Sequence, residues 1–334
     1  MQLICINRKR KWFAPLGRGL ARAWVAGCSL LLLMSSVSAG PVPRDASHPL
    51  RVLTTIAPIY SWTAAVAGTN AIVENLLPAD IGPHDFQFRP RDLKRIQSAD
   101  LILINGLGLE QWLDRALQQN KAAPGASVVA VSEGWPATNL IYDLPGVSDP
   151  AVTRPTPSIA ANTARKPNPH VWLDPIFAIH AVTQILHALE SADPENSAGY
   201  RANAGTYLDR LTRLDAEFRA ATAQWKSRPV VTFHDAFPYF CRRYDLDLVG
   251  VIEEVPGNGP TPRHLAALLK LVRERHVGVL FTETQFNPRL ARQLATDLAI
   301  PVAELDVLET GALTADAYEE GQRRNLATLR KYLR

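Results

Sequence analysis

Short apolar runs alternate with longer amphipathic stretches along most of this chain. Several of the runs consist of uninterrupted Val, Ile and Leu, which is typical of parallel strands buried on both faces. Helical patterns follow most of them and often open with Asp, Thr or Asn before a proline, a helix-start signal. The predicted strands are residues 51–55, 71–76, 101–105, 127–131, 230–233, 246–252, 277–281 and 302–305. This alternation predicts an α/β fold.

An interruption separates four of these strand–helix units from four more. Residues 133–169 are rich in Pro, Asn, Ser and Thr and show little periodicity, so we expect a long loop there. A helix should start at Asp174-Pro175, and a second at Asp193-Pro194 that runs to about Trp225. A helix of about 30 residues spans roughly 45 Å, which is enough to join two lobes. The alternative is an ordinary long helix packed within one domain.

The first 39 residues are typical of a secretory signal peptide. Six Arg and Lys residues lead into the apolar run 24–37, and Val37-Ser38-Ala39 offers small residues for cleavage after Ala39. The apolar run of about 14 residues is shorter than the ~20 needed to span a bilayer, so a retained anchor is the lesser alternative. Val25-Ala26-Gly27-Cys28 matches a lipoprotein processing site only weakly, because most of the apolar run follows Cys28.

The predicted signal peptide, or leader, also changes how the charge and the cysteines of the chain are interpreted. The whole chain has 36 basic and 32 acidic residues, but removing the leader leaves 30 against 32, a net charge of −2. No dominant basic block remains, so we expect no nucleic-acid partner. Cys5 and Cys28 leave with the leader, and Cys241 alone can form no internal disulfide.

Three histidines each lie between a strand-like run and a helix-start signal. They are His84 after Pro83, His170 after Pro169, and His234 after Phe233, and a fourth turn of this kind ends in Asp306. All four follow the carboxyl ends of predicted strands, where open α/β sheets bind their ligands. Two such edges facing one another across a cleft could supply two ligands each to one metal ion.

Each candidate also has a structural explanation. His84 could be an exposed turn residue, His234 a helix cap or a hydrogen-bonded core residue, and Asp306 a turn cap. Asp174, close to His170, is well explained as a helix N-cap. Glu283, which ends the strand predicted at 277–281, competes with Asp306 for the fourth ligand position.

At these residues the chain resembles the zinc/manganese solute-binding proteins of bacterial ABC importers, the family that includes ZnuA and TroA. The resemblance runs from about Arg51 to Leu333 and is carried by four motifs in this order: Pro83-His84-Asp85-Phe86, Pro169-His170-Val171-Trp172-Leu173-Asp174-Pro175, His234-Asp235-Ala236-Phe237 and Glu283-Thr284-Gln285-Phe286. It implies two lobes, each with a four-stranded mostly parallel sheet flanked by helices, joined by one long rigid helix with the metal in the cleft. Residues 40–192 would form the first lobe, 193–227 the linking helix and 228–334 the second lobe.

The resemblance also implies a ligand set. His84, His170 and His234 match the family's three imidazole positions, and the carboxylate position after the last strand falls on Asp306. Two departures from the family pattern are the lack of histidine in residues 133–169 and the loose match of Val307-Leu308-Glu309-Thr310-Gly311.

Three neutral imidazoles and one carboxylate suit Zn²⁺, whereas Mn²⁺ prefers more oxygen ligands. Family members that carry manganese or iron often have a carboxylate where His234 stands here. We therefore expect a periplasmic, monomeric, non-enzymatic protein that captures Zn²⁺ and delivers it to the membrane permease of an ABC importer. Binding should weaken below about pH 6, because the ordinary pKa of an imidazole is ~6.5.

Three alternatives stay open from the sequence. The cargo could be Mn²⁺ or iron in the same kind of importer. The chain could be a zinc hydrolase with Glu283 as general base, although no hydrolase motif is present. It could also be an adhesion protein in which the metal is a structural staple.

Overall fold

The computed structural model describes residues 48–113, 126–142, 166–253 and 259–334. The chain divides into two units, Met1–Gly40 and Pro41–Arg334, and the first lies wholly outside the described residues. The signal peptide and its cleavage site therefore stay predictions, and much of the loop predicted at 133–169 also lies outside these residues. Within the described ranges, no helix is both long enough and apolar enough to cross a membrane.

The first lobe is built on a parallel four-stranded sheet. Its strands pair in the order β2-β1-β3-β4, with Val52 of the central strand opposite both Val73 and Leu101. The elements of this lobe are β1 (Leu50–Thr54), α1 (Ala57–Ala67), β2 (Ala71–Asn75), α2 (Pro90–Gln97), β3 (Leu101–Ile104) and β4 (Ser127–Ala130). A short 3-10 turn, η1 (Ala137–Asn139), follows.

The second lobe repeats this topology with the strand order β6-β5-β7-β8, again all parallel. Its elements are β5 (Pro229–Thr232), α6 (Pro238–Arg243), β6 (Asp247–Val251), α7 (Pro262–Glu274), β7 (Leu280–Glu283), α8 (Arg289–Leu298) and β8 (Val302–Leu305). In each sheet the strand that comes first in the chain lies between the second and the third. The chain therefore runs first toward one edge of the sheet and then toward the other. Ligands of open α/β sheets bind outside the carboxyl ends of strands at such a point.

All eight predicted strands are present, and only β7 is shifted by more than one residue. It begins at Leu280 instead of Val277 because the backbone N–H of Val277 donates to the carbonyl of Val272. That hydrogen bond closes the turn after α7, in which His276 takes a left-handed φ of 53°. Residues 277–279 therefore form the connection between α7 and β7.

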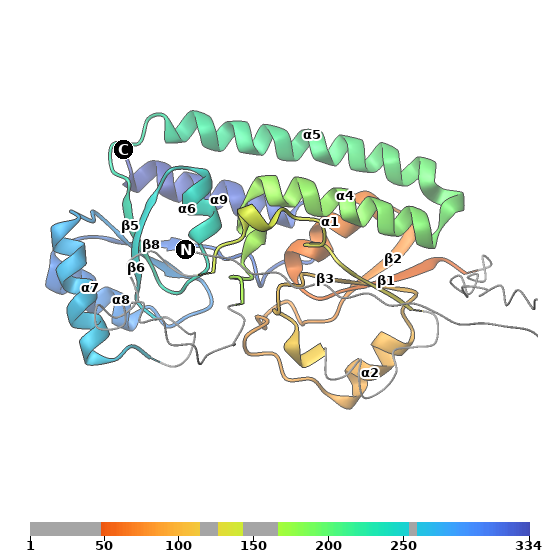
Figure 1. The fold of residues 1–334 in the computed structure, drawn as a ribbon, viewed down its shortest axis with the longest axis horizontal. Coiled ribbons are helices and arrows are strands. Elements are labelled where there is room, and N and C mark those ends of the chain that lie inside the picture. The colour runs from red at the N-terminus through yellow and green to blue at the C-terminus, as the bar shows by residue number, and fades with distance from the viewer. Residues whose placement is uncertain (1–47, 114–125, 143–165, 254–258) are drawn as a thin grey trace, which may run out of the picture. The chain divides into compact units, whose positions relative to one another are not determined.

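Long helices pack over both sheets (Figure 1). They are α4 (Pro175–Ala192), α5 (Ser197–Thr222) and α9 (Ala317–Tyr332), with the 3-10 turns η2 (Val171–Leu173) and η3 (Pro194–Asn196) before the first two. The predicted long helix is confirmed in α5, whose 26 residues extend about 39 Å. The carboxylate of Asp174 accepts a hydrogen bond from the backbone N–H of Ile176 at 2.9 Å, which confirms the predicted cap of α4.

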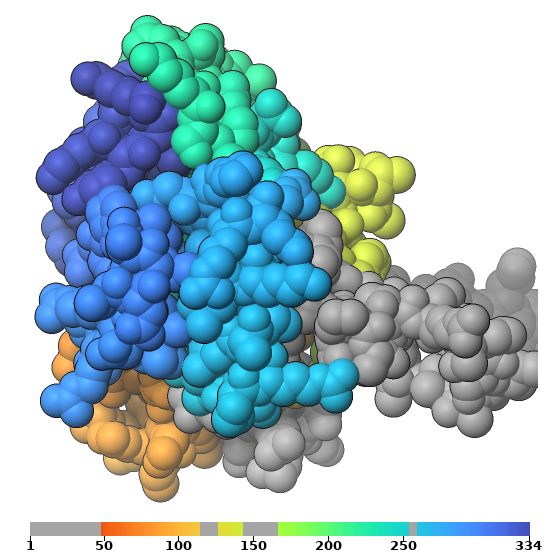
Figure 2. Space-filling view, turned by 90° about the vertical axis from the view of Figure 1, so that its left-hand side faces the viewer, coloured from red at the N-terminus to blue at the C-terminus, as the bar shows by residue number. Residues whose placement is uncertain are grey.

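One hydrophobic core runs through both lobes. The same buried cluster includes residues from β1, α4 and α5 and continues into β8 and α9. Trp62 of α1 packs edge-on against Tyr318 of α9, with ring centroids 5.0 Å apart. A second, smaller cluster lies between the other face of the second sheet and helices α7 and α8, which cover the face seen in Figure 2.

Candidate metal centre

Three histidines and one carboxylate converge between the lobes. One ligand atom from each of His84, His170, His234 and Glu309 lies within 4.8 Å of the others. The Nε2 atom of His170 is 3.2 Å from Nε2 of His84 and 3.2 Å from Nε2 of His234. Oε1 of Glu309 lies 3.6 Å from Nε2 of His84 and 3.5 Å from Nε2 of His170. Ligands about 2.0–2.1 Å from a tetrahedral Zn²⁺ stand roughly 3.3–3.4 Å apart, so these spacings match such an ion.

His84 lies on the turn after β2 and is the most accessible of the four. Its side chain is 30% exposed, whereas that of Glu309 is 1% exposed. Burial is the main reason why the pKa of His84 falls to about 4, and the neighbouring His170 and His234 lower it further, against the opposing effect of Glu309. The imidazole is therefore neutral and able to bind a metal at and well below neutral pH.

His170 stands on a tight turn before η2. Oδ1 of Asn168 is 2.9 Å from the backbone N of His170 and 2.9 Å from its Nδ1. The side-chain amide of Asn105, at the end of β3, donates to the carbonyl of Pro169 at 3.0 Å. Burial, and then the proximity of His234, hold the pKa of His170 well below its ordinary value.

His234 directly follows β5 and is paired with Glu283 at the end of β7. Its backbone N–H donates to Oε1 of Glu283 at 3.0 Å, and its Nδ1 makes a short contact with Oε2. Since the carboxylate holds Nδ1, the Nε2 atom faces the cluster, an arrangement common behind metal-binding histidines. Burial lowers the pKa of His234, but the charge and hydrogen bond of Glu283 outweigh burial and raise it.

Glu283 is therefore not placed as the fourth ligand or as a free general base. Both of its carboxylate oxygens are engaged by His234. The zinc-hydrolase alternative needed this group to act on a bound water.

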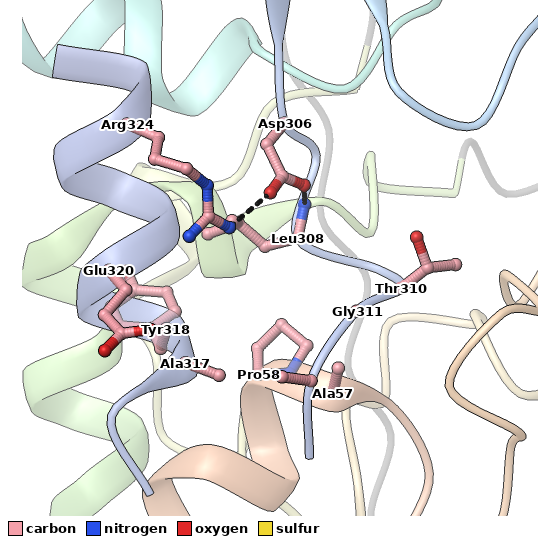
Figure 3. A pocket seen from close by; sticks show the side chains of 11 residues that line it. Ala57, Pro58, Asp306, Leu308, Thr310, Gly311, Ala317, Tyr318, Glu320 and Arg324 are labelled. Atoms are coloured by element: carbon pink, nitrogen blue, oxygen red, sulfur yellow. Dashed lines mark hydrogen bonds and ion pairs between the residues drawn. The ribbon is translucent and has the colours of Figure 1, made fainter. Parts of the chain in front are cut away.

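The structure does not bring Asp306 together with the three histidines. Its Oδ2 accepts from Nη2 of Arg324 at 3.0 Å, and its Oδ1 accepts from the backbone N–H of Leu308 at 2.8 Å. It lines a separate pocket together with Pro58, Tyr318 and other residues of α1, α9 and the connecting loop (Figure 3). Glu309, three residues later, takes the place beside the histidines.

The backbone after β8 explains this change. Leu308 has a left-handed φ of 63°, which a Leu rarely adopts, so the position of the next side chain is hard to predict from sequence. Leu308 is held against α9 at Gly321, where an added Cβ would stand 2.2 Å from the Cδ2 atom of Leu308. The only signal in the sequence that pointed to Glu309 was that two acidic residues, Asp306 and Glu309, follow β8 within four positions.

Glu309 carries the clearest sign of a cation-binding site. Its Oε2 accepts from the side-chain amide of Gln285 at 2.9 Å, but its buried Oε1 has no hydrogen-bond partner within the described part of the chain. An unpartnered buried carboxylate oxygen is costly. A divalent cation among the three Nε2 atoms would give this oxygen a partner, so the residues present fit a metal ion.

Comparison with known proteins identifies the family of this chain. The profile of the family described as "Zinc-uptake complex component A periplasmic" matches residues 52–332. The zinc-binding protein AdcA of Streptococcus pyogenes is 28% identical over 298 residues, which cover 85% of this chain and 56% of AdcA. This chain thus spans about half the length of that relative.

Two further proteins match over nearly their whole length. The high-affinity zinc uptake system protein ZnuA of Bacillus subtilis is 28% identical over 286 residues, covering 85% of this chain and 87% of that protein. The solute-binding protein FpvC of Pseudomonas aeruginosa, solved in complex with Mn²⁺, is similar with a TM-score of 0.71 and 27% identity. That match covers 86% of this chain and 98% of FpvC.

Proposed function

Since the chain belongs to the family of the periplasmic zinc-uptake complex component A, we propose that it binds one Zn²⁺ ion through His84, His170, His234 and Glu309. The observation that carries this proposal is the unpartnered, buried Oε1 of Glu309, which faces imidazole nitrogens at 3.5 and 3.6 Å. Three nitrogen donors and one oxygen donor favour zinc over metals that need more oxygen ligands.

Charge balance supports a divalent ion. Glu309 and Glu283 are the carboxylates closest to the imidazoles, and Glu283 stays paired with His234. Two negative charges and one Zn²⁺ sum to zero in a site where an unbalanced charge would be expensive. Mn²⁺ has the same charge and is bound by the similar protein FpvC, so manganese is the second candidate cargo.

The protein would act as a carrier, as its relatives' names suggest. It would capture Zn²⁺ in the periplasm and hand the ion to the permease of an ABC importer in the membrane. The ion would enter the site past the partly exposed His84. The closed set of four protein ligands favours carriage over hydrolysis, because a catalytic zinc keeps a position open for water.

The test is metal content followed by competition titration. Protein purified without chelator is analysed for bound metals, then stripped and titrated with Zn²⁺ and Mn²⁺. One equivalent of zinc that Mn²⁺ does not displace would support the proposal, and a preference for Mn²⁺ would change the cargo. An absence of stoichiometric metal would overturn it. The exposed His187, on α4 and outside the cluster, provides a matched control: His187→Ala should retain the zinc that His84→Ala, His170→Ala and His234→Ala lose.

A further inference from the structure

A single side-chain amide connects the turns that carry His170 and His234. Nδ2 of Asn168 donates to the carbonyl of Asp235 at 2.8 Å, in the second lobe and next to His234. Oδ1 of the same amide accepts from the backbone N–H of His170 at 2.9 Å and lies 2.9 Å from Nδ1 of that ring. The NH₂ group of the amide therefore bonds to the second lobe, and its oxygen bonds to the first.

The backbone of Asn168 is held from both lobes as well. Its N–H donates to the carbonyl of Ile141 at 2.7 Å, and its carbonyl accepts from the hydroxyl of Tyr239 on α6 at 2.8 Å. The same hydroxyl accepts from the backbone N–H of Ile141 at 3.1 Å. Tyr239 thus contacts the peptide groups around Asn168 without touching its side-chain amide.

These contacts determine which way the amide points. An amide can present either its oxygen or its NH₂ group to a neighbour, and a histidine can carry its proton on either nitrogen. The carbonyl of Asp235 can only accept a hydrogen bond, so the NH₂ group must face it and the oxygen must face His170. That oxygen also only accepts, so Nδ1 of His170 must carry the proton, which leaves the lone pair of Nε2 free to bind a metal.

We propose, on the basis of the metal function proposed above, that Asn168 is a positioning residue that fixes the metal-binding tautomer of His170 and couples it to the second lobe. His234 differs, because Glu283, its partner, comes from the neighbouring strand of the same sheet and can only accept. The tautomer of His234 is therefore set within one lobe. The amide that sets the tautomer of His170 is held twice, by the backbone N–H of His170 in its own lobe and by the carbonyl of Asp235 in the other.

This arrangement gives a route to metal release. Separating the two turns, as docking on a permease would require, breaks the hydrogen bond between Asn168 and Asp235. The amide then keeps only the backbone N–H of His170 as an anchor, so a rotation that presents its NH₂ group to Nδ1 becomes easier. Such a rotation favours the proton on Nε2 and removes one ligand. A small displacement of the turns would thus lower affinity without unfolding either lobe.

The experiment uses the full chain with ¹⁵N-labelled histidine. Imidazole nitrogen shifts of the metal-free protein give the tautomer of each ring, and transfer of Zn²⁺ to a chelator gives the dissociation rate. In Asn168→Ala we expect the Nδ1-protonated form of His170 to lose its dominance, His234 to be unchanged and dissociation to accelerate about tenfold or more, as for other residues behind metal ligands. Asn168→Asp keeps an acceptor for Nδ1–H and should keep the tautomer.

Tyr239→Phe is the matched control, because it removes a hydrogen bond between the lobes but leaves the Asn168 amide in place. It should leave the His170 tautomer unchanged. An unchanged tautomer in Asn168→Ala would overturn the proposal, as would a changed tautomer with an unchanged dissociation rate. If the wild-type protein binds no zinc, the function proposed above fails. The tautomer comparison in the metal-free protein still decides the role of Asn168.

Discussion

At the scale of single residues, the carboxylate beside the three histidines is Glu309 and not the predicted Asp306. Glu309 has a buried oxygen without a partner, whereas Asp306 is satisfied by Arg324 and by the backbone of Leu308. Both acids follow the same strand, so substituting each in turn separates the two assignments.

We expect Glu309→Ala to weaken zinc binding by more than about 100-fold, since even changes behind a ligand cost 10–100-fold. The metal-free protein should melt at a higher temperature, because an unpaired buried carboxylate is removed. Asp306→Ala should change zinc affinity by less than about threefold, or roughly 0.6 kcal/mol. Competition titration and thermal melting of both variants make the comparison. Loss of zinc binding in Asp306→Ala would restore the assignment predicted from sequence.

The pH dependence of binding also belongs to individual residues. Burial keeps the pKa of His84 at about 4 and that of His170 well below its usual range, so both rings are already neutral at pH 5.5. Of the three imidazoles only His234, whose pKa Glu283 raises, must lose a proton to bind the metal, while burial also raises the pKa of the Glu309 carboxyl. The three imidazoles should therefore contribute about one proton per zinc, not three, to the fall in affinity from pH 7.5 to 5.5.

Titrations at several pH values, or calorimetry in buffers of different ionisation enthalpy, count these protons. In Glu283→Gln the slope should fall below that of the wild type, because the charge that raises the pKa of His234 is gone. A slope near three would mean that all three imidazoles keep their ordinary pKa, as the sequence alone suggested.

The three histidines could be predicted because each stands in a short motif at the end of a strand. The carboxylate could not, because its position depends on the left-handed backbone of Leu308 and its contact with α9, neither of which is encoded by local pattern. Glu283 was recognised as relevant, but only the register of β7 beside β5 shows that it lies behind His234.

At the scale of secondary-structure elements, the contact of α9 with the turn after β8 fixes the position of Glu309. An added methyl group at Gly321 would overlap Leu308, whose next neighbour is Glu309. Overpacking of this kind typically costs about 1–3 kcal/mol. We expect Gly321→Ala to lower the melting temperature and to weaken zinc binding.

Gly205 provides the control for that substitution. It lies within α5, and an added Cβ there would meet no atom within 4 Å. Gly205→Ala should stabilise the protein by about 0.5–1 kcal/mol and leave zinc affinity unchanged. Equal effects of the two substitutions on zinc binding would show that the α9 contact does not position Glu309.

The elements themselves were largely predictable. All eight strands and the long helix follow from hydrophobic runs and helix-start signals, and the cap at Asp174 was identified correctly. The first part of the strand predicted at 277–281 was wrong, because Val277 is needed to close the helix turn. Periodicity also gives no information on strand order, so the shared β2-β1-β3-β4 and β6-β5-β7-β8 arrangement appears only in the structure.

At the scale of the whole molecule, the two sheets share one core instead of having one each. Helices α1, α4, α5 and α9 pack together over both, and the cluster that they enclose continues from β1 to β8. We expect heat to unfold both lobes in a single cooperative transition. A hundredfold excess of zinc over its Kd should stabilise the native state by about 2.7 kcal/mol.

Differential scanning calorimetry checks this expectation by comparing the calorimetric and van't Hoff enthalpies, which agree for a two-state transition. Two resolved transitions, with only one of them moved by zinc, would show that the lobes unfold independently.

The shared core also determines how fast the protein can load. A wide swing of one lobe against the other would have to part Trp62 from Tyr318 and expose apolar surface to water. An arriving ion therefore does not wait for a slow closing motion. In the proposed function it would meet the accessible His84 first and exchange its hydration shell for the buried donors afterwards. Capture should accordingly keep pace with the supply of free ions, while the slow step of the cycle is the unloading that a partner must provoke.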